Sequence, residues 1–99
     1  MDDRYKVRLK GRASRFILSQ LPRIRNLLIK QLDELAQNPI PPNNKPLDSK
    51  MGIYRVRCEK YYFLYQIQTH KFLILVAAIG SRGDIKRFYK EIMGIINKK

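Results

Sequence analysis

Cysteine, histidine and acidic side chains are scarce in this chain of 99 residues. The single cysteine, Cys58, cannot form an internal disulfide, and its place on the apolar side of a predicted strand indicates a buried structural thiol. The single histidine, His70, lies in a predicted hairpin turn, which is typical of a solvated side chain. The acids never show the spacing of a metal site or a catalytic pair, and no glycine-rich phosphate loop is present. The sequence therefore argues against a metal-dependent nuclease and predicts no metal and no cofactor.

Long hydrophobic runs are also missing. No apolar segment is long and uncharged enough to span a bilayer, and the N-terminus lacks the apolar core of a signal peptide. We therefore expect a cytoplasmic protein with no membrane partner. The length is sufficient for one hydrophobic core without disulfides or metals, so we expect residues 1–99 to form a single domain.

Basic residues, by contrast, are abundant. The chain has 21 lysines and arginines against 8 acids, a formal net charge of +13. Residues 4–30 include nine basic side chains and no acidic one. Such a field attracts nucleic acid, an acidic protein or an anionic membrane surface, and solubility alone is the simpler alternative.

The first half of the chain predicts a strand and two helices. Tyr5, Val7 and Leu9 alternate with basic residues, which is typical of a half-buried strand with a basic outer face. Apolar residues then recur at helical spacing over residues 13–21 and, after Pro22, to Leu35, which predicts an α-hairpin. Residues 38–46, which are rich in proline and asparagine, predict a loop without regular structure.

The second half predicts three strands and a helix. Ile53–Cys58, Tyr61–Gln68 and residues 72–79 alternate like strands, and the connections between them are too short for a crossover, so we expect antiparallel pairing. The last strand is apolar on both faces, which indicates a central strand covered on both sides. Asp84 is the expected N-cap of an amphipathic helix whose apolar positions are Ile85, Phe88, Tyr89, Ile92, Met93 and Ile96.

These elements predict an α+β fold. We expect a compact antiparallel four-stranded sheet, mixed at the first strand, with an N-terminal α-hairpin and a C-terminal helix.

Arg55 and Arg57 are the first candidates for a functional site. Strand alternation places both on one face of the sheet, opposite Val56 and Cys58. Adjacent guanidiniums repel each other unless an anion lies over them, and a phosphate backbone is the obvious candidate in so basic a chain. A solvated sheet face and a docking surface for an acidic partner are the alternatives.

The order of these parts resembles the RelE/ParE toxin superfamily over nearly the whole chain. The resemblance is carried by a basic first strand, an α-hairpin, and then the segments GIYRVR, YYFLYQI, KFLILVAAIG and SRGDI. It implies a small toxin of a toxin–antitoxin pair. RelE-like members cut mRNA in the ribosomal A site without a metal, whereas ParE-like members poison DNA gyrase.

The resemblance also implies site residues. Arg55 and Arg57 stand where RelE-like members place basic residues on the strand after the loop, and Arg82 stands where an arginine clamps the scissile phosphate. Lys86 occupies the position where many members have a tyrosine, and Tyr89 follows one helical turn later. Catalysis is therefore assigned to these five residues, although Tyr89 is also explained as an ordinary core aromatic.

One departure from the family pattern weakens this assignment. Tyr62 replaces a basic residue of the family's active site, and Lys60 in the preceding turn is positioned to supply the missing charge. General RNA binding is assigned to basic residues of this turn, of the turn before Ile53 and of the first strand, namely Lys60, Lys50, Arg4, Lys6 and Arg8. The basic strand is also explained as a solvated face.

Three functions therefore remain open. The first is a ribosome-dependent mRNA endoribonuclease, the second is a ParE-like gyrase inhibitor, and the third is a catalytically weakened homologue that binds only RNA or an antitoxin. The expected partners are an acidic, partly disordered antitoxin, which would form a hetero-oligomer with the toxin, and mRNA in the ribosomal A site.

Overall fold

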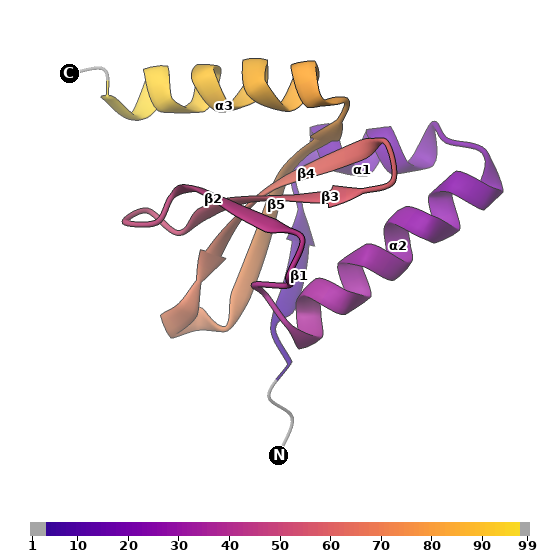
Figure 1. The fold of residues 1–99 in the computed structure, drawn as a ribbon, viewed down its shortest axis with the longest axis horizontal. Coiled ribbons are helices and arrows are strands. Elements are labelled where there is room, and N and C mark those ends of the chain that lie inside the picture. The colour runs from indigo at the N-terminus through magenta and orange to yellow at the C-terminus, as the bar shows by residue number, and fades with distance from the viewer. Residues whose placement is uncertain (1–3, 98–99) are drawn as a thin grey trace.

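The computed structural model describes residues 4–97, with side chains described through residue 94. Two helices follow the first strand, four strands succeed one another, and a long helix ends the described chain (Figure 1). In chain order the elements are β1 (Lys6–Leu9), α1 (Gly11–Leu18), α2 (Pro22–Gln37), β2 (Asn44–Asp48), β3 (Ile53–Cys58), β4 (Tyr61–Gln68), the short 3₁₀ helix η1 (Thr69–Lys71), β5 (Leu73–Gly80) and α3 (Arg82–Asn97).

The sheet has five strands in the order β1-β5-β4-β3-β2. β1 is parallel to β5 and all other pairs are antiparallel, so the α+β class and the mixed first strand are confirmed. The prediction of four strands was wrong, because part of the expected loop forms β2 and pairs with β3. Pro46 lies in β2, where its missing N–H is tolerated because β2 is an edge strand.

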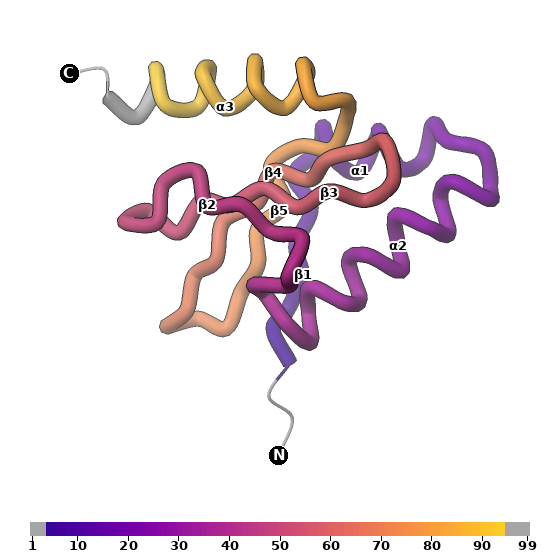
Figure 2. Tube along the Cα trace, viewed as in Figure 1, coloured from indigo at the N-terminus to yellow at the C-terminus, as the bar shows by residue number. Residues whose placement is uncertain are grey.

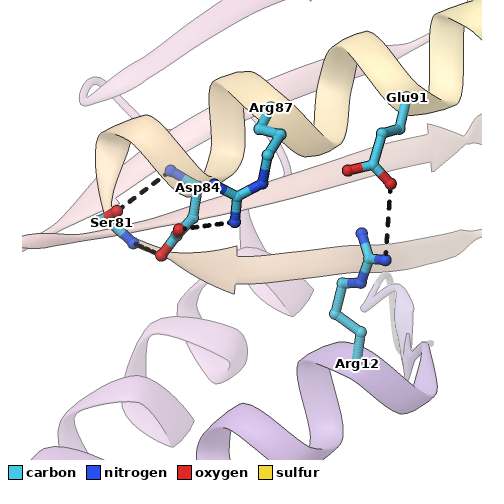
Figure 3. A network of polar contacts seen from close by, with 5 residues as sticks. All are labelled: Arg12, Ser81, Asp84, Arg87 and Glu91. Carbon is cyan, nitrogen blue, oxygen red and sulfur yellow. Dashed lines mark hydrogen bonds and ion pairs between the residues drawn. The ribbon is translucent and has the colours of Figure 1, made fainter.

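The helices cover the two faces of the sheet. α1 and α2 form the predicted hairpin, and Leu28 and Leu35 of α2 are buried against Val56 and Phe63 on one face. On the other face Ile85 of α3 joins a second buried cluster with Ile53, Leu64 and Ala78. Figure 2 shows α3 running across one end of the sheet, with its first turns near α1, and Arg12 of α1 forms an ion pair with Glu91 of α3 at 3.9 Å (Figure 3). β5 is therefore the covered central strand that its apolar sequence predicts.

The start of α3 differs from the prediction. Ser81, not Asp84, caps the helix: the Ser81 hydroxyl accepts a hydrogen bond from the backbone N–H of Asp84 at 3.1 Å. The Asp84 carboxylate accepts one from the N–H of Ser81 at 3.2 Å, and another from Arg87 at 3.0 Å (Figure 3). This reciprocal capping box places Arg82 in the first turn of α3. Ile96, the last apolar position expected on this helix, lies outside the residues whose side chains are described.

Cys58 and His70 lie where the sequence places them. The Cys58 side chain is buried, and this burial raises the pKa of its thiol, as expected for an unreactive structural cysteine. His70 is exposed in η1. Within the described residues, no cluster of three or more His, Cys, Asp or Glu side chains is placed to hold a metal ion. None of the described helices has the length and apolar character needed to cross a membrane.

Candidate functional site

A basic cavity lies where α3 meets the β2–β3 edge of the sheet. Its volume is about 250 Å³, and the residues that line it are Lys45, Leu47, Arg55, Arg82, Ile85, Lys86 and Tyr89. Four of these seven side chains are cationic and none is a carboxylate. We call this cavity the basic pocket. Its charge suits an anionic ligand that accepts several hydrogen bonds.

Three elements contribute the polar side chains of the basic pocket. Lys45 of β2 is the cross-strand partner of Arg55 in β3, so the two side chains leave neighbouring strands at the same level. Arg82, Lys86 and Tyr89 are spaced by four and three residues along α3, which places them on one face of the helix. The pocket therefore forms only when α3 packs onto this end of the sheet.

Tyr89 links α3 to the edge strand. Its hydroxyl donates a hydrogen bond to the backbone carbonyl of Leu47 at 3.3 Å, and its ring is partly buried in the cluster under α3. The phenol is therefore held at the wall of the basic pocket. The core and the site interpretations of Tyr89 are compatible, because the ring packs while the hydroxyl borders the pocket.

Tyr62 lies between the two arginines of β3. The Cζ atoms of Arg55 and Arg57 lie 5.0 and 5.9 Å from the centroid of its ring. A cation over an aromatic face is attracted by the ring quadrupole, worth about 0.5–1 kcal/mol at exposed sites. The Tyr62 ring therefore stabilises the two guanidiniums near it.

Arg57, which the family resemblance assigns to catalysis together with Arg82, does not line the basic pocket. Its Nε donates a hydrogen bond to the backbone carbonyl of Glu59 at 2.8 Å. The side chain borders a different cavity of about 250 Å³ beside α2, together with Lys30, Gln31 and Glu34. The structure thus brings together Arg55 and the three α3 candidates but separates Arg57 from them.

The residues predicted to bind RNA are spread over the molecule. Lys50 lines a larger cavity of about 630 Å³ at the β2–β3 turn. The Nζ of Lys60 lies 5.6 Å from the centroid of the Tyr61 ring, and both residues border a cavity of about 380 Å³ beside α2. Arg4, Lys6 and Arg8 are exposed at β1, the edge opposite β2. RNA contact by these residues stays a prediction.

The sequence matches a known family over most of its length. The model of that family, described as ParE toxin of type II toxin–antitoxin system, parDE, matches residues 7–86. The chain is a type II toxin of the RelE/ParE superfamily. No curated protein sequence matches this toxin significantly.

Solved structures share the toxin's fold. The toxin–antitoxin complex RelBE2 from Mycobacterium tuberculosis contains a chain that is 25% identical, with a TM-score of 0.68 over 80% of this chain and 99% of that one. A variant of Escherichia coli toxin RelE in the free state is 21% identical, with a TM-score of 0.73 over 93% and 98% of the two chains. The archaeal RelE–RelB complex from Pyrococcus horikoshii gives 19% identity and a TM-score of 0.73 over 80% and 96%.

Lys45 is the cationic pocket residue of this toxin that the sequence did not predict, and Leu47 is an apolar one. Lys45 lies in the segment expected to be a loop, because prolines and asparagines dominate residues 38–46. The one available signal is that Lys45 and Leu47 alternate around Pro46 as they would in a strand, and both line the basic pocket.

Proposed function

We propose that the toxin is a metal-independent endoribonuclease that cuts mRNA in the ribosomal A site and so blocks translation. The observation that supports this proposal is the composition of the basic pocket, in which Lys45, Arg55, Arg82 and Lys86 surround one cavity beside the Tyr89 hydroxyl. A phosphodiester flanked by ribose hydroxyls matches a pocket of several cations with no carboxylate in its lining.

In the proposed reaction the nucleophile is a 2′-hydroxyl of the mRNA itself. The 2′-hydroxyl attacks the adjacent phosphorus, a bond forms between O2′ and phosphorus, and the bond to O5′ breaks in line with it. The products are a 2′,3′-cyclic phosphate and a 5′-hydroxyl. Arg55 and Arg82 stabilise the negative charge of the pentavalent transition state, because guanidiniums donate several hydrogen bonds to non-bridging oxygens.

Two protons move in this reaction. One leaves the 2′-hydroxyl and one reaches the departing O5′, and the α3 side chains Lys86 and Tyr89 are the pocket groups able to carry them. Lys45 adds a third positive charge near the phosphate. Arg57 lies outside the pocket, so it is not assigned to the transition state and instead contacts RNA beside the scissile phosphate in this proposal.

The proposal is tested by primer extension on cellular mRNA after brief induction of the toxin. We expect 5′ ends that map within translated codons and that disappear when ribosomes are blocked before elongation. The same cells provide plasmid for a gyrase supercoiling assay. Intact mRNA together with relaxed or linearised plasmid would overturn the endonuclease proposal.

Gyrase inhibition is the second candidate function. It is favoured by the family model, whose description names ParE toxins and which matches residues 7–86. Gyrase binding does not require arginines to meet at one phosphate. Arg57 and Arg82, the pair whose convergence would separate the two functions, line different cavities, whereas the cavity that Arg55 shares with Arg82 supports the nuclease. A third candidate, a weakened homologue that binds RNA or antitoxin without cleavage, is favoured by Tyr62 in place of a basic residue.

We also propose that an acidic antitoxin neutralises the toxin. The RelBE2, Escherichia coli RelBE and archaeal RelE relatives were each crystallised as toxin–antitoxin complexes. Two large apolar side chains at the α-hairpin tip, Leu18 and Leu21, are 68% and 75% exposed, and they offer a partner apolar surface beside Arg15 and Arg23. The proposed mRNA substrate places the toxin in the cytoplasm.

A further inference from the structure

A second and larger cavity lies away from the basic pocket. It has a volume of about 630 Å³, is open to solvent, and is bordered by the residues after α2, the β2–β3 turn, the end of β4 and η1. In Figure 1 the β2–β3 turn and the β4–β5 connection lie at the left and lower left of the view, on the side away from the tip of the α-hairpin. We call it the tyrosine cavity, because Tyr5 and Tyr54 both line it.

One wall of the tyrosine cavity is held against the sheet. Gly52 in the β2–β3 turn has φ +70°, and its carbonyl accepts a hydrogen bond from the Ile67 N–H at 2.8 Å. A Cβ at this position would lie 2.6 Å from the Ile67 carbonyl oxygen, so glycine alone allows the close approach. The turn that carries Lys50 is therefore fixed relative to β4.

Tyr54 provides a rigid aromatic surface in this cavity. Its ring stacks on Tyr65, with centroids 6.0 Å apart and an interplanar angle of 27°. The buried Tyr65 hydroxyl donates to the Pro39 carbonyl at 2.7 Å and accepts from Asn44 at 2.7 Å. Burial raises the pKa of Tyr65 to about 12, so the phenol remains the proton donor that this arrangement requires. A ring supported in this way loses little conformational entropy when a ligand stacks on it.

The charge of the tyrosine cavity favours an anionic ligand with a flat ring. Lys50 is exposed in its lining, His70 lies nearby in the same lining, and no aspartate or glutamate lines the cavity. Side-chain amides such as that of Gln68 add groups able to hydrogen bond to a base edge. Single-stranded nucleic acid combines these features, because bases stack on aromatic side chains while cations contact the backbone.

We propose that the tyrosine cavity binds one nucleotide of single-stranded RNA outside the scissile position, with the base on Tyr54 and its phosphate beside Lys50. The inference rests on the proposed function only in taking RNA as the ligand, and it requires no cleavage. Leu47 lines the basic pocket and Ser49, two residues later, lines the tyrosine cavity. Tyr54 and Arg55 are consecutive in β3, so the two cavities open on opposite faces of the sheet. In this proposal one RNA strand passes round the β2–β3 turn, and its contact with Tyr54 and Lys50 holds the strand beside the basic pocket.

The test uses the full chain and a six-nucleotide single-stranded RNA with 2′-O-methyl groups, which cannot be cut by 2′-hydroxyl attack. Fluorescence anisotropy gives the Kd. We expect Lys50→Ala to weaken binding at least about fivefold more than Lys71→Ala. Lys71 is a matched control, since it is an exposed lysine of η1 that does not line the cavity. Tyr54→Phe keeps the stacking ring and the affinity, whereas Tyr54→Leu loses about fivefold or more.

Photo-crosslinking locates the base directly. With 5-iodouracil in the same hexamer, we expect the crosslinked tyrosine to be Tyr54, identified by mass spectrometry. Equal effects of Lys50→Ala and Lys71→Ala, or crosslinks only at Tyr62 or Tyr89, would overturn the inference and leave the proposed nuclease standing. Displacement of the hexamer by an equal concentration of a polyglutamate peptide would instead assign the cavity to an acidic protein segment. Crosslinks at Tyr54 without mRNA cleavage in cells would overturn the proposed nuclease activity and support RNA binding in the tyrosine cavity.

Discussion

The Cζ atom of Arg55 lies 5.0 Å from the centroid of the Tyr62 ring, on the strand next to its own. Arg57 approaches the same ring at 5.9 Å. Two like charges two residues apart on one strand are thus stabilised by an aromatic ring before any phosphate binds. An arginine pair on a strand therefore does not by itself require an anionic ligand. The cavity that Arg55 shares with Arg82 is the observation that indicates a phosphate site.

Substitutions of Tyr62 test whether its aromatic ring stabilises Arg55 and Arg57. We expect Tyr62→Leu to lower the free energy of unfolding by about 0.5–1 kcal/mol more than Tyr62→Phe, because leucine keeps apolar contact but removes the ring quadrupole. Urea denaturation of both variants measures the difference. Equal stabilities would show that the ring acts only as apolar surface.

Arg82 tests the phosphate contact. We expect Arg82→Ala to reduce mRNA cleavage by a factor that corresponds to about 2–4 kcal/mol of transition-state stabilisation, by analogy with the loss of one oxyanion donor. Lys90→Ala is the control, since Lys90 is an exposed cation of α3 that lies outside the lining of the basic pocket. Primer extension on purified ribosome complexes measures both variants. Equal losses of cleavage in Arg82→Ala and Lys90→Ala would show that Arg82 contributes only general positive charge.

Lys86 and Tyr89 are distinguished by two separate substitutions. Tyr89→Phe removes the hydroxyl that donates to Leu47 but keeps the packed ring, and Lys86→Met removes the ammonium but keeps the length of the side chain. Because two protons move in the proposed reaction and each side chain carries one of them, we expect each variant to lose about 10²–10⁴-fold in single-turnover cleavage. Cleavage rates close to wild type in both variants would show that neither of these α3 side chains transfers a proton.

Asp84 makes the stability of the toxin dependent on pH. Hydrogen bonds from the side chain and backbone of Ser81, and the nearby Arg87, hold the pKa of Asp84 below its usual value. A carboxyl with a lowered pKa in the folded state stabilises the fold above its unfolded pKa of about 3.9 and loses that contribution as the pH falls through the folded pKa. We therefore expect Asp84→Ala to have a lower Tm than wild type at pH 6 and a difference that narrows toward pH 2. A difference independent of pH would contradict the capping role of the carboxylate.

The antitoxin is expected to be acidic and to fold as it binds. Its carboxylates approach Arg55, Arg57 or Arg82, and its apolar side chains cover either Phe88 and Ile92 of α3 or the α-hairpin. Co-expression with the neighbouring open reading frame, followed by pull-down at low and high salt, measures the complex. We expect retention that weakens as salt increases. Absence of a complex at any salt, or a complex with a basic partner, would contradict this prediction.

The sequence by itself determined the elements whose signals are local. Alternation of period two predicts β1, β3, β4 and β5, and helical spacing predicts the α-hairpin and α3, because each pattern reflects which side chains of one segment face the core. The same alternation places Arg55 and Arg57 on one face of β3. The resemblance to the family added Arg82, Lys86 and Tyr89 as candidate site residues.

Only the tertiary structure decided what these elements bring together. β2 exists because β3 offers it a partner, and its own sequence, with Pro46 at its centre, carries little strand signal. Lys45 is therefore identified as a pocket residue only by its pairing with Arg55 in the folded sheet. Ser81 and Asp84 cap α3 jointly, which sets where the helix begins and which of its side chains reach the β2–β3 edge. The separation of Arg57 from the basic pocket likewise depends on where its side chain is held, by a hydrogen bond from its Nε to the Glu59 carbonyl, and on where α3 crosses the sheet, which no local pattern encodes.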